Sequence, residues 1–100
     1  MAYTNTLTAL GDPTRRFILE KLRDRPRAVG EIAAGMTISR PAVSQHLKVL
    51  KDSGLVTETR QGTRHYFAIA PEGIGELRSY LDGLWSDALA AFARHVEASR

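Results

Sequence analysis

The sequence predicts a mainly α-helical domain that contains one small β-hairpin. Apolar residues recur with the helical period up to about residue 53 and again after residue 71. The segment between them is rich in Val, Thr, Tyr, Phe and Ile, and a Gly-containing turn divides it. One hundred residues make a single domain. Because a domain of this size buries only a modest core, we expect a partner subunit to add to it.

Three short helices are expected in the first part of the chain, over about residues 1–10, 13–24 and 29–36. Asp12 and Pro13 are typical of the N-cap and the first residue of the second helix. Ala28 precedes the third helix, where a Ser or Thr would be expected. The third helix is therefore predicted to start without a side-chain cap.

A fourth helix is predicted from Ser39, a good N-cap, to the stop at Ser53 and Gly54. Its apolar residues at i, i+4 and i+7 form one narrow stripe that we expect in the core, consisting of Val43, Leu47 and Leu50. Residues 35–38 separate this helix from the third one. A connection of three or four residues is the length found in helix-turn-helix pairs.

The opposite face of the fourth helix is polar. It carries Ser44, Gln45 and Lys48, with Arg40 at its N-terminal end. Hydroxyl, amide and cationic groups are the donors that meet base edges and phosphates in a DNA major groove. A merely solvated surface would carry more Glu and Asp, and only Asp52 lies on this face.

A β-hairpin is expected directly after the fourth helix, with strands over residues 55–60 and 64–69 and a three-residue turn over 61–63. A hairpin in this position is the wing of a winged helix. Arg60 and Arg64 flank its turn, where cations can reach backbone phosphates or the minor groove. The predicted architecture is a winged helix-turn-helix with five helices and a two-stranded wing.

The fifth helix is predicted over about residues 72–98, because no Pro follows Pro71 and a long apolar stripe runs through this segment. A helix of 25 residues is roughly 37 Å long, which exceeds what a small winged domain covers. We therefore expect one domain over residues 1–100 whose terminal helices, about 1–10 and 72–98, form a homodimer interface. The residues expected there are Tyr3, Leu7, Leu10, Leu77, Leu81, Leu84, Ala88 and Phe92.

The charge of the chain is unevenly distributed. The net charge is +3, but residues 1–70 carry eleven Lys or Arg against six Asp or Glu, whereas residues 71–100 carry three against five. The basic part contains the fourth helix and the wing, which favours a polyanionic partner such as double-stranded DNA. We expect Arg40, Ser44, Gln45 and His46 at base edges, Ser39 and Lys48 at phosphates, and Arg60 and Arg64 as anchors of the wing.

Two histidines leave alternatives open. His46 lies near the edge of the apolar stripe, so it either packs at the edge of the fourth helix or contacts a phosphate. His65 on the second wing strand is expected to be exposed.

Several functional classes are excluded or disfavoured by the composition. The chain has no Cys, which removes disulfides, thiolate metal sites and cysteine redox switches. No apolar stretch is long enough to span a membrane and no signal peptide is visible, so we expect a cytoplasmic protein. No nucleophile–base arrangement, Gly-rich phosphate loop or carboxylate pair indicates an enzyme, and no cofactor is expected.

Four segments resemble those of the ArsR-type winged-helix transcriptional repressors. They are LGDPTRRFILEKL at 10–22, VGEIA at 29–33, SRPAVSQHLKVLKDSGLV at 39–56 and RQGTRHYFAI at 60–69. The resemblance covers about residues 7–98. It implies a homodimer that places two recognition helices on operator DNA and usually represses its own operon until a signal releases it.

The chain departs from the metal-sensing members of that family. In the thiolate sensors a Cys-x-Cys pair opens the third helix. The positions in this chain that look equivalent hold Ala28 and Gly30. The ligand pattern of the last helix falls on Asp82, Leu84, His95 and Ala98, so two of four ligands are missing. We interpret His95 as a surface or interface residue and the chain as similar to the metal-independent branch.

Two other functions remain open at this point. One is a sensor that binds a small organic effector, or a metal through nitrogen and oxygen groups, at the dimer interface. The other is a winged helix that acts as a protein-interaction module. That module predicts apolar or aromatic residues on the outward face of residues 40–52, where this sequence has polar ones.

Overall fold

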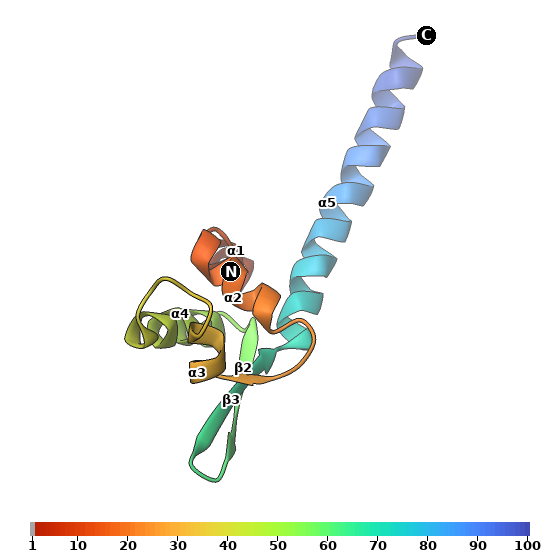
Figure 1. Cartoon of the computed structure of the whole chain (residues 1–100). Coiled ribbons are helices and arrows are strands. Elements are labelled where there is room, and N and C mark those ends of the chain that lie inside the picture. The colour runs from red at the N-terminus through yellow and green to blue at the C-terminus, as the bar shows by residue number, and fades with distance from the viewer. Residues whose placement is uncertain (1) are drawn as a thin grey trace.

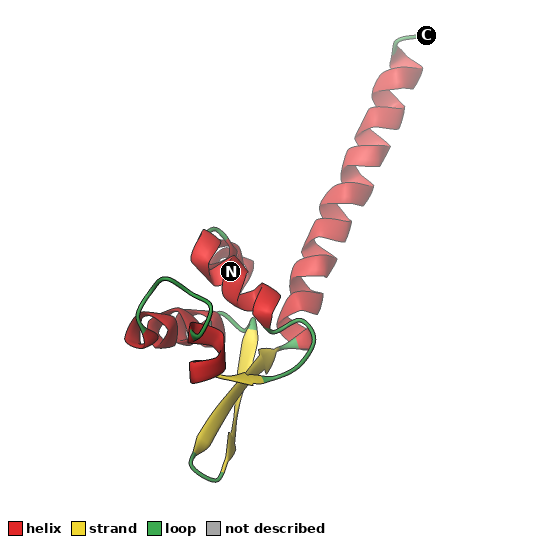
Figure 2. Cartoon of the chain, in the orientation of Figure 1, coloured by secondary structure: helices red, strands yellow, loops and turns green. Residues whose placement is uncertain are grey.

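The computed structural model describes the backbone of residues 2–100 and the side chains from Asn5 onward. Over this part the chain forms five helices and three strands (Figures 1 and 2). In chain order they are α1 (Ala2–Leu10), α2 (Pro13–Lys21), β1 (Arg27–Ala28), α3 (Val29–Ala33), α4 (Arg40–Asp52), β2 (Val56–Gln61), β3 (Arg64–Ile69) and α5 (Pro71–Ala98). The mainly helical fold with a hairpin wing is confirmed.

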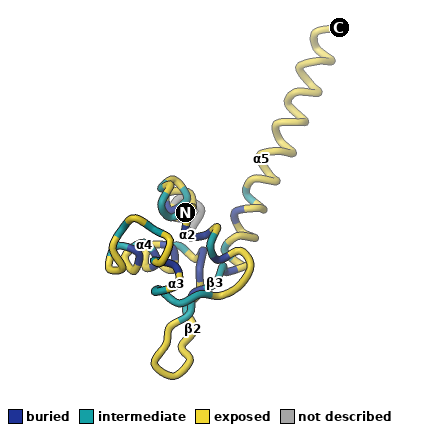
Figure 3. Tube along the Cα trace, viewed as in Figure 1, coloured by how far each residue is buried: buried dark blue, intermediate teal, exposed yellow. Residues whose placement is uncertain are grey.

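The core lies between α2, α3, α4 and the base of the hairpin (Figure 3). Six apolar side chains in it are completely buried, namely Ile18, Ile32, Val43, Leu47, Leu50 and Leu55. Three of these form the stripe that the sequence predicts on α4. Their burial fixes the rotation of α4 about its own axis, so the polar face of the helix points outward.

The sheet contains one strand more than the sequence predicts. Its order is β1-β3-β2, and all pairs are antiparallel, with Arg27 opposite Phe67 and Ala28 opposite Tyr66. The expectation of a two-stranded wing is therefore incomplete. A strand of two residues has no alternating pattern of its own, and only its pairing with β3 defines it.

The hairpin turn is also shorter than predicted. Gln61 pairs with Arg64, so the turn consists of Gly62 and Thr63 rather than of three residues. Gly62 has a φ of +63°. A two-residue turn of type II′ has Gly at its first position, because a positive φ there costs Gly nothing.

Asp12 and Ser39 cap α2 and α4 as predicted. The Asp12 carboxylate accepts hydrogen bonds from the backbone amides of Thr14 at 2.7 Å and Arg15 at 3.2 Å. Ser39 Oγ accepts one from the amide of Ala42 at 3.3 Å. The helix after Ala28 has no such cap from that residue, as expected.

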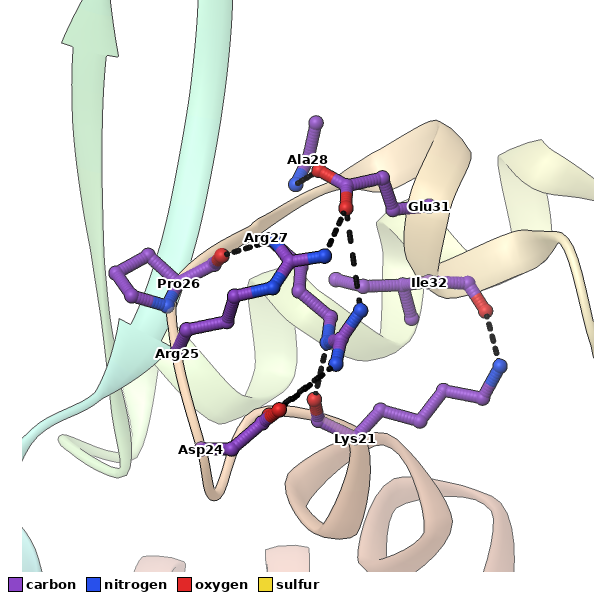
Figure 4. A network of polar contacts seen from close by, with 8 residues as sticks. All are labelled: Lys21, Asp24, Arg25, Pro26, Arg27, Ala28, Glu31 and Ile32. Atoms are coloured by element: carbon purple, nitrogen blue, oxygen red, sulfur yellow. Dashed lines mark hydrogen bonds and ion pairs between the residues drawn. The ribbon is translucent and has the colours of Figure 1, made fainter.

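A network of arginines joins the end of α2 to α3 (Figure 4). Arg27 Nε donates to the carbonyl of Lys21 at 2.6 Å, and its Nη2 donates to both carboxylate oxygens of Asp24 at 3.2 Å. Arg25 donates to Glu31 at 2.8 Å. α2 ends at Lys21, three residues before the predicted end at Asp24. The carbonyl of Lys21 has no partner within the helix, and it accepts the hydrogen bond from Arg27 instead. α3 likewise ends at Ala33, before the predicted residue 36.

The end of α4 is in close contact with the start of α5. After the C-cap, Gly54 has a φ of +79°, and the amide of Leu55 donates to the carbonyl of Leu50 at 2.9 Å, as in a Schellman motif. Gly73 lies against the carbonyl of Gly54, and a Cβ at position 73 would overlap that oxygen. This contact fixes where α5 leaves the domain.

α5 projects far beyond the rest of the molecule (Figure 1). It has 28 residues, which corresponds to roughly 42 Å, and the molecule measures 65 × 26 × 25 Å. Only its first turns pack on the domain, where Leu77 is buried, while residues 81–100 are all exposed (Figure 3). Among the described residues, no helix is both long and apolar enough to cross a membrane.

The contact between Gly54 and Gly73 predicts the effect of an added methyl group. Gly73→Ala should lower the free energy of unfolding by about 1–3 kcal/mol, because the backbone must move to accommodate the Cβ. Gly75→Ala is the control, since a Cβ there meets nothing within 4 Å, and it should raise stability by up to about 1 kcal/mol. Urea unfolding at one protein concentration measures both. Equal stability of the two variants would contradict the contact.

Candidate nucleic-acid interface

A groove of about 840 Å³ separates α4 from the wing. Its α4 wall carries Arg40, Ser44 and Lys48, and its wing wall carries Arg64 and His65. The two polar surfaces that the sequence analysis identified separately therefore face the same space. The lining of the groove is mixed, because it also includes Lys51, the carboxylates of Glu31, Asp52 and Glu58, and the apolar side chains of Val29 and Phe67. Residues 28–31, at the end of β1 and in the first turn of α3, contribute to it as well.

Arg40 lies against the first turn of α3. Its Nη1, Cζ and Nη2 atoms are all 3.6–3.7 Å from the position that a Cβ on Gly30 would occupy. The guanidinium group therefore lies flat over this glycine, at the edge of the groove. Within residues 5–100, neither Arg40 nor Arg64 forms an ion pair, so both charges are available to a ligand.

Lys48 is paired in the free protein. Its Nζ atom lies 2.9 Å from Asp52 Oδ2, one helical turn away. The hydrogen bond to Asp52 and the charge of this carboxylate raise the pKa of Lys48. Both side chains are largely exposed, and an exposed pair of this kind is weak. A phosphate can therefore compete with Asp52 for the lysine.

Glu58 connects α4 to both strands of the wing. Its carboxylate lies 2.9 Å from Lys51 Nζ and 2.6 Å from His65 Nδ1. The hydrogen bond from Lys51, followed by that from His65, lowers the pKa of Glu58. The exposure expected for His65 is observed, but the ring is anchored to this carboxylate rather than free.

His46 lies on another side of α4, away from the groove lining. It is half-buried, and its Nδ1 atom is 3.4 Å from Nη1 of Arg15 in α2. The ring thus packs at the edge of α4, and the contact of His46 with a phosphate stays a prediction. Gln45 and Arg60 are exposed but do not line the groove either: Gln45 lies at the outermost part of α4, and Arg60 lies on β2.

Three residues of this region were not identified from the sequence, namely Arg15, Lys51 and Glu58. A signal for Lys51 exists, because it follows Ser44 by seven residues and thus lies on the same side of α4. Glu58 and Arg15 gave no local signal. Their partners lie 7 and 31 residues away along the chain, and only folding brings them together.

The expected dimer residues fall into two groups. Leu7, Leu81, Leu84, Ala88 and Phe92 are exposed, and Phe92 has 65% of its surface accessible. Leu10 and Leu77 instead pack within their own chain. Tyr3 lies outside the described side chains.

No group of three or more His, Asp or Glu side chains able to hold a metal ion occurs in the described part of the chain. His95 lies on the exposed distal part of α5. Metal independence stays a prediction.

The chain is similar to known regulatory proteins over most of its length. Residues 12–58 match the family model described as bacterial regulatory protein, arsR family. The chain is 48% identical over 90 residues to the HTH-type transcriptional regulator Rv2034 of Mycobacterium tuberculosis, which covers 90% of this chain and 84% of that protein. It is 37% identical over 65 residues to the transcriptional repressor SdpR of Bacillus subtilis, covering 65% and 72%.

A solved structure is similar as well. The solution structure of the homodimeric winged helix-turn-helix DNA-binding domain Mb0332 from Mycobacterium bovis aligns with a TM-score of 0.70 and 31% identity. The alignment covers 86% of this chain and 80% of that one.

The contacts of Glu58 predict a pH-dependent contribution to stability. At pH 7, Glu58→Gln should lower the free energy of unfolding by about 0.2–1 kcal/mol, as for other partly exposed ion pairs. Because the pKa of Glu58 is lowered by folding, its contribution is present above the unfolded pKa and is lost as the pH falls through the folded pKa.

Wild type and Glu58→Gln should therefore converge in stability once the pH has fallen below the folded-state pKa of Glu58. Urea unfolding at a series of pH values measures this. Glu76→Gln is the control, since Glu76 is exposed and has no ion pair among the described residues. A difference at pH 7 that persists unchanged at low pH would contradict the role of the carboxylate.

Proposed function

This chain belongs to the arsR family of bacterial regulatory proteins, and we propose that it represses transcription as a homodimer bound to an inverted-repeat DNA operator. It is a transcriptional regulator with the winged helix-turn-helix fold, and this family membership agrees with the expectation that it is not an enzyme. A regulator of this kind acts where the DNA is, so we place it in the cytoplasm.

The observation that carries this proposal is the groove between α4 and the wing. Arg40 and Arg64 lie on its two walls without ion-pair partners in the described part of the chain. The three acids that line the groove are already paired: Asp52 with Lys48, Glu58 with Lys51 and His65, and Glu31 with Arg25. Two uncompensated arginines beside neutralised acids favour a polyanion over a cationic or neutral ligand.

The positions of the side chains suggest a division of roles. Gln45, at the outermost part of α4, and the neighbouring Ser44 and Arg40 would meet base edges in the major groove. Ser39 and Lys48 would contact phosphates, and Arg60 and Arg64 would hold the wing against the DNA backbone or minor groove. His46 would contact a phosphate at the other edge of α4. These contacts sort the site into sequence-reading and positioning residues.

Homodimerisation is supported by the exposed apolar face of α5. Its distal half exposes Leu81, Leu84, Trp85, Leu89 and Phe92, and contiguous apolar surface of this kind marks an interface. A second copy of the chain offers the same face, and Leu7 of α1 is exposed as well. The related Mb0332 domain is homodimeric. With α4 of each subunit in the major groove, a two-fold axis would place the half-sites roughly 34–36 Å apart.

Sequence-specific binding is tested by comparing two substitutions on sites selected from a random DNA library. Gln45→Ala should cost about 1–3 kcal/mol on the preferred site and relax its sequence preference, because a base contact is lost. Arg64→Ala should weaken binding to all sequences more evenly and reduce the salt slope by about 1, because a phosphate contact is lost. Fluorescence anisotropy over a salt series measures both. If Gln45→Ala weakened binding to selected and random DNA equally, Gln45 would have no role in reading the sequence.

Dimerisation through α5 is tested by placing charges on its apolar face. Leu81→Glu combined with Phe92→Glu should yield monomers, because the carboxylates would be buried against apolar partners, and operator binding should weaken strongly. Ser79→Glu combined with Ser86→Glu adds the same charge on another face of α5 and should remain dimeric. Sedimentation at micromolar concentration reports the state. A monomeric wild type that binds one half-site as tightly as the full palindrome would exclude the dimer model.

A further inference from the structure

We propose that Arg15 is a positioning residue that connects α1 to α4 and holds the ring of His46 with its Nε2–H available to donate to DNA. The inference rests on the proposed function, because Arg15 would act through His46, which is one of the proposed DNA contacts. Arg15 itself lies in α2 and has only 15% of its side chain accessible. It does not line the groove.

The guanidinium group of Arg15 contacts three different elements. Its Nε donates to the carbonyl of Ala9 at 2.8 Å, and its Nη2 donates to that of Thr8 at 3.4 Å. Both carbonyls belong to the last turn of α1. Its Nη1 lies 3.4 Å from His46 Nδ1 on α4 and 3.6 Å from Asp12 Oδ2 at the start of α2. One planar group thus joins α1, α2 and α4.

Comparison with Arg16 shows that the contacts of Arg15 go beyond capping the C-terminus of α1. It is the next residue in the chain, and its Nη1 donates to the carbonyl of Leu10 at 2.6 Å, so it also binds the C-terminus of α1. Both cations suit the negative end of that helix. Arg16 is exposed and makes no contact with α4 among the hydrogen bonds and ion pairs of the described residues. Of these two arginines, Arg15 is the one that also contacts α4 among the described residues.

The contact with Arg15 selects one tautomer of His46. A guanidinium group has five donors and no acceptor. The facing Nδ1 atom of His46 must therefore accept, and in the neutral ring the proton then lies on Nε2. Nε2 has no partner among the described residues. The ring is left with one free N–H donor, which is the group that a phosphate oxygen accepts from.

A second contact fixes the orientation of α1 on α4. Thr6 Oγ1 in α1 donates to the carbonyl of Ser53, the C-cap of α4, at 3.2 Å. Ser53 lies seven residues beyond His46, which is roughly 10 Å along the helix. Two polar contacts at this separation oppose rotation of α4 against α1. α1 adjoins the proposed dimer interface. The contacts of Arg15 and Thr6 therefore couple the geometry of the dimer to the position of α4.

The tautomer of His46 is tested first in the free protein by ¹⁵N NMR of the imidazole nitrogens at a pH where the ring is neutral. Wild type should show the Nε2–H form. Arg15→Gln should shift the ring to a mixture of tautomers, because the amide can turn either its oxygen or its NH₂ group toward Nδ1. Arg16→Gln removes the same charge and a neighbouring α1 contact, and it should keep the wild-type form. An Nδ1–H form in the wild type would overturn the proposal.

The effect on DNA is then measured with inverted repeats whose half-site spacing varies by single base pairs. Arg15→Gln should bind the best repeat roughly tenfold more weakly than wild type, because the charged hydrogen bond that orients His46 is lost. Its preference for one half-site spacing should also become weaker. Arg16→Gln should keep the preference. Arg15→Lys retains the charge and is the second variant in case Arg15→Gln fails to fold. A lysine side chain cannot span three elements, so the spacing preference of Arg15→Lys should become weaker too.

The positioning role would be overturned if affinity depended on half-site spacing in the same way in Arg15→Gln, Arg15→Lys and Arg16→Gln. His46→Ala in the Arg15→Gln background should add little further loss, since the two residues act in one contact. Failure of the proposed function is recognised separately: a wild type that selects no DNA sequence would defeat it. In that case an Arg15-dependent Nε2–H tautomer would still confirm the contact between Arg15 and His46.

Discussion

The burial of one apolar stripe on α4 is the constraint on which the interface depends. Val43, Leu47 and Leu50 lose all contact with solvent, and at about 25 cal/mol per Å² of buried apolar area this outweighs any preference of the polar side chains. The helix has one rotation that satisfies the stripe, and this rotation turns Ser44 and Gln45 outward. The Schellman motif at Gly54 and the contact with Gly73 then determine how the chain leaves the helix and where α5 begins.

The charges around the groove are arranged so that few remain uncompensated. Glu58 is shared by Lys51 and His65, and Asp52 is paired with Lys48. These pairs are partly exposed and contribute little to stability, but they decide which cations a polyanion meets first. Of the arginines and lysines that line the groove, Arg40 and Arg64, on opposite walls, are the two without an ion pair among the described residues. The net charge of the chain alone would not have distinguished them.

The connection of α1 to α4 joins the two halves of the proposed function. The exposed face of α5 and α1 would bind a second subunit, and α4 would bind DNA. Arg15 lies between them, and its contacts to the last turn of α1 and to His46 involve one rigid guanidinium plane. A change at the dimer interface would reach the DNA-contacting helix through this group and through Thr6.

The sequence by itself determined the five helices, the hairpin, the caps at Asp12 and Ser39 and the polar face of α4, because each depends on spacing and side-chain chemistry within a few residues. Tertiary structure alone decided the pairing of β1 with β3, the two-residue turn after Gln61 and the burial of Leu77 within its own chain. It also decided which partner each charge finds. His46 and Arg15 are 31 residues apart, and no local pattern encodes their contact, because it exists only once α2 and α4 have packed on the same core.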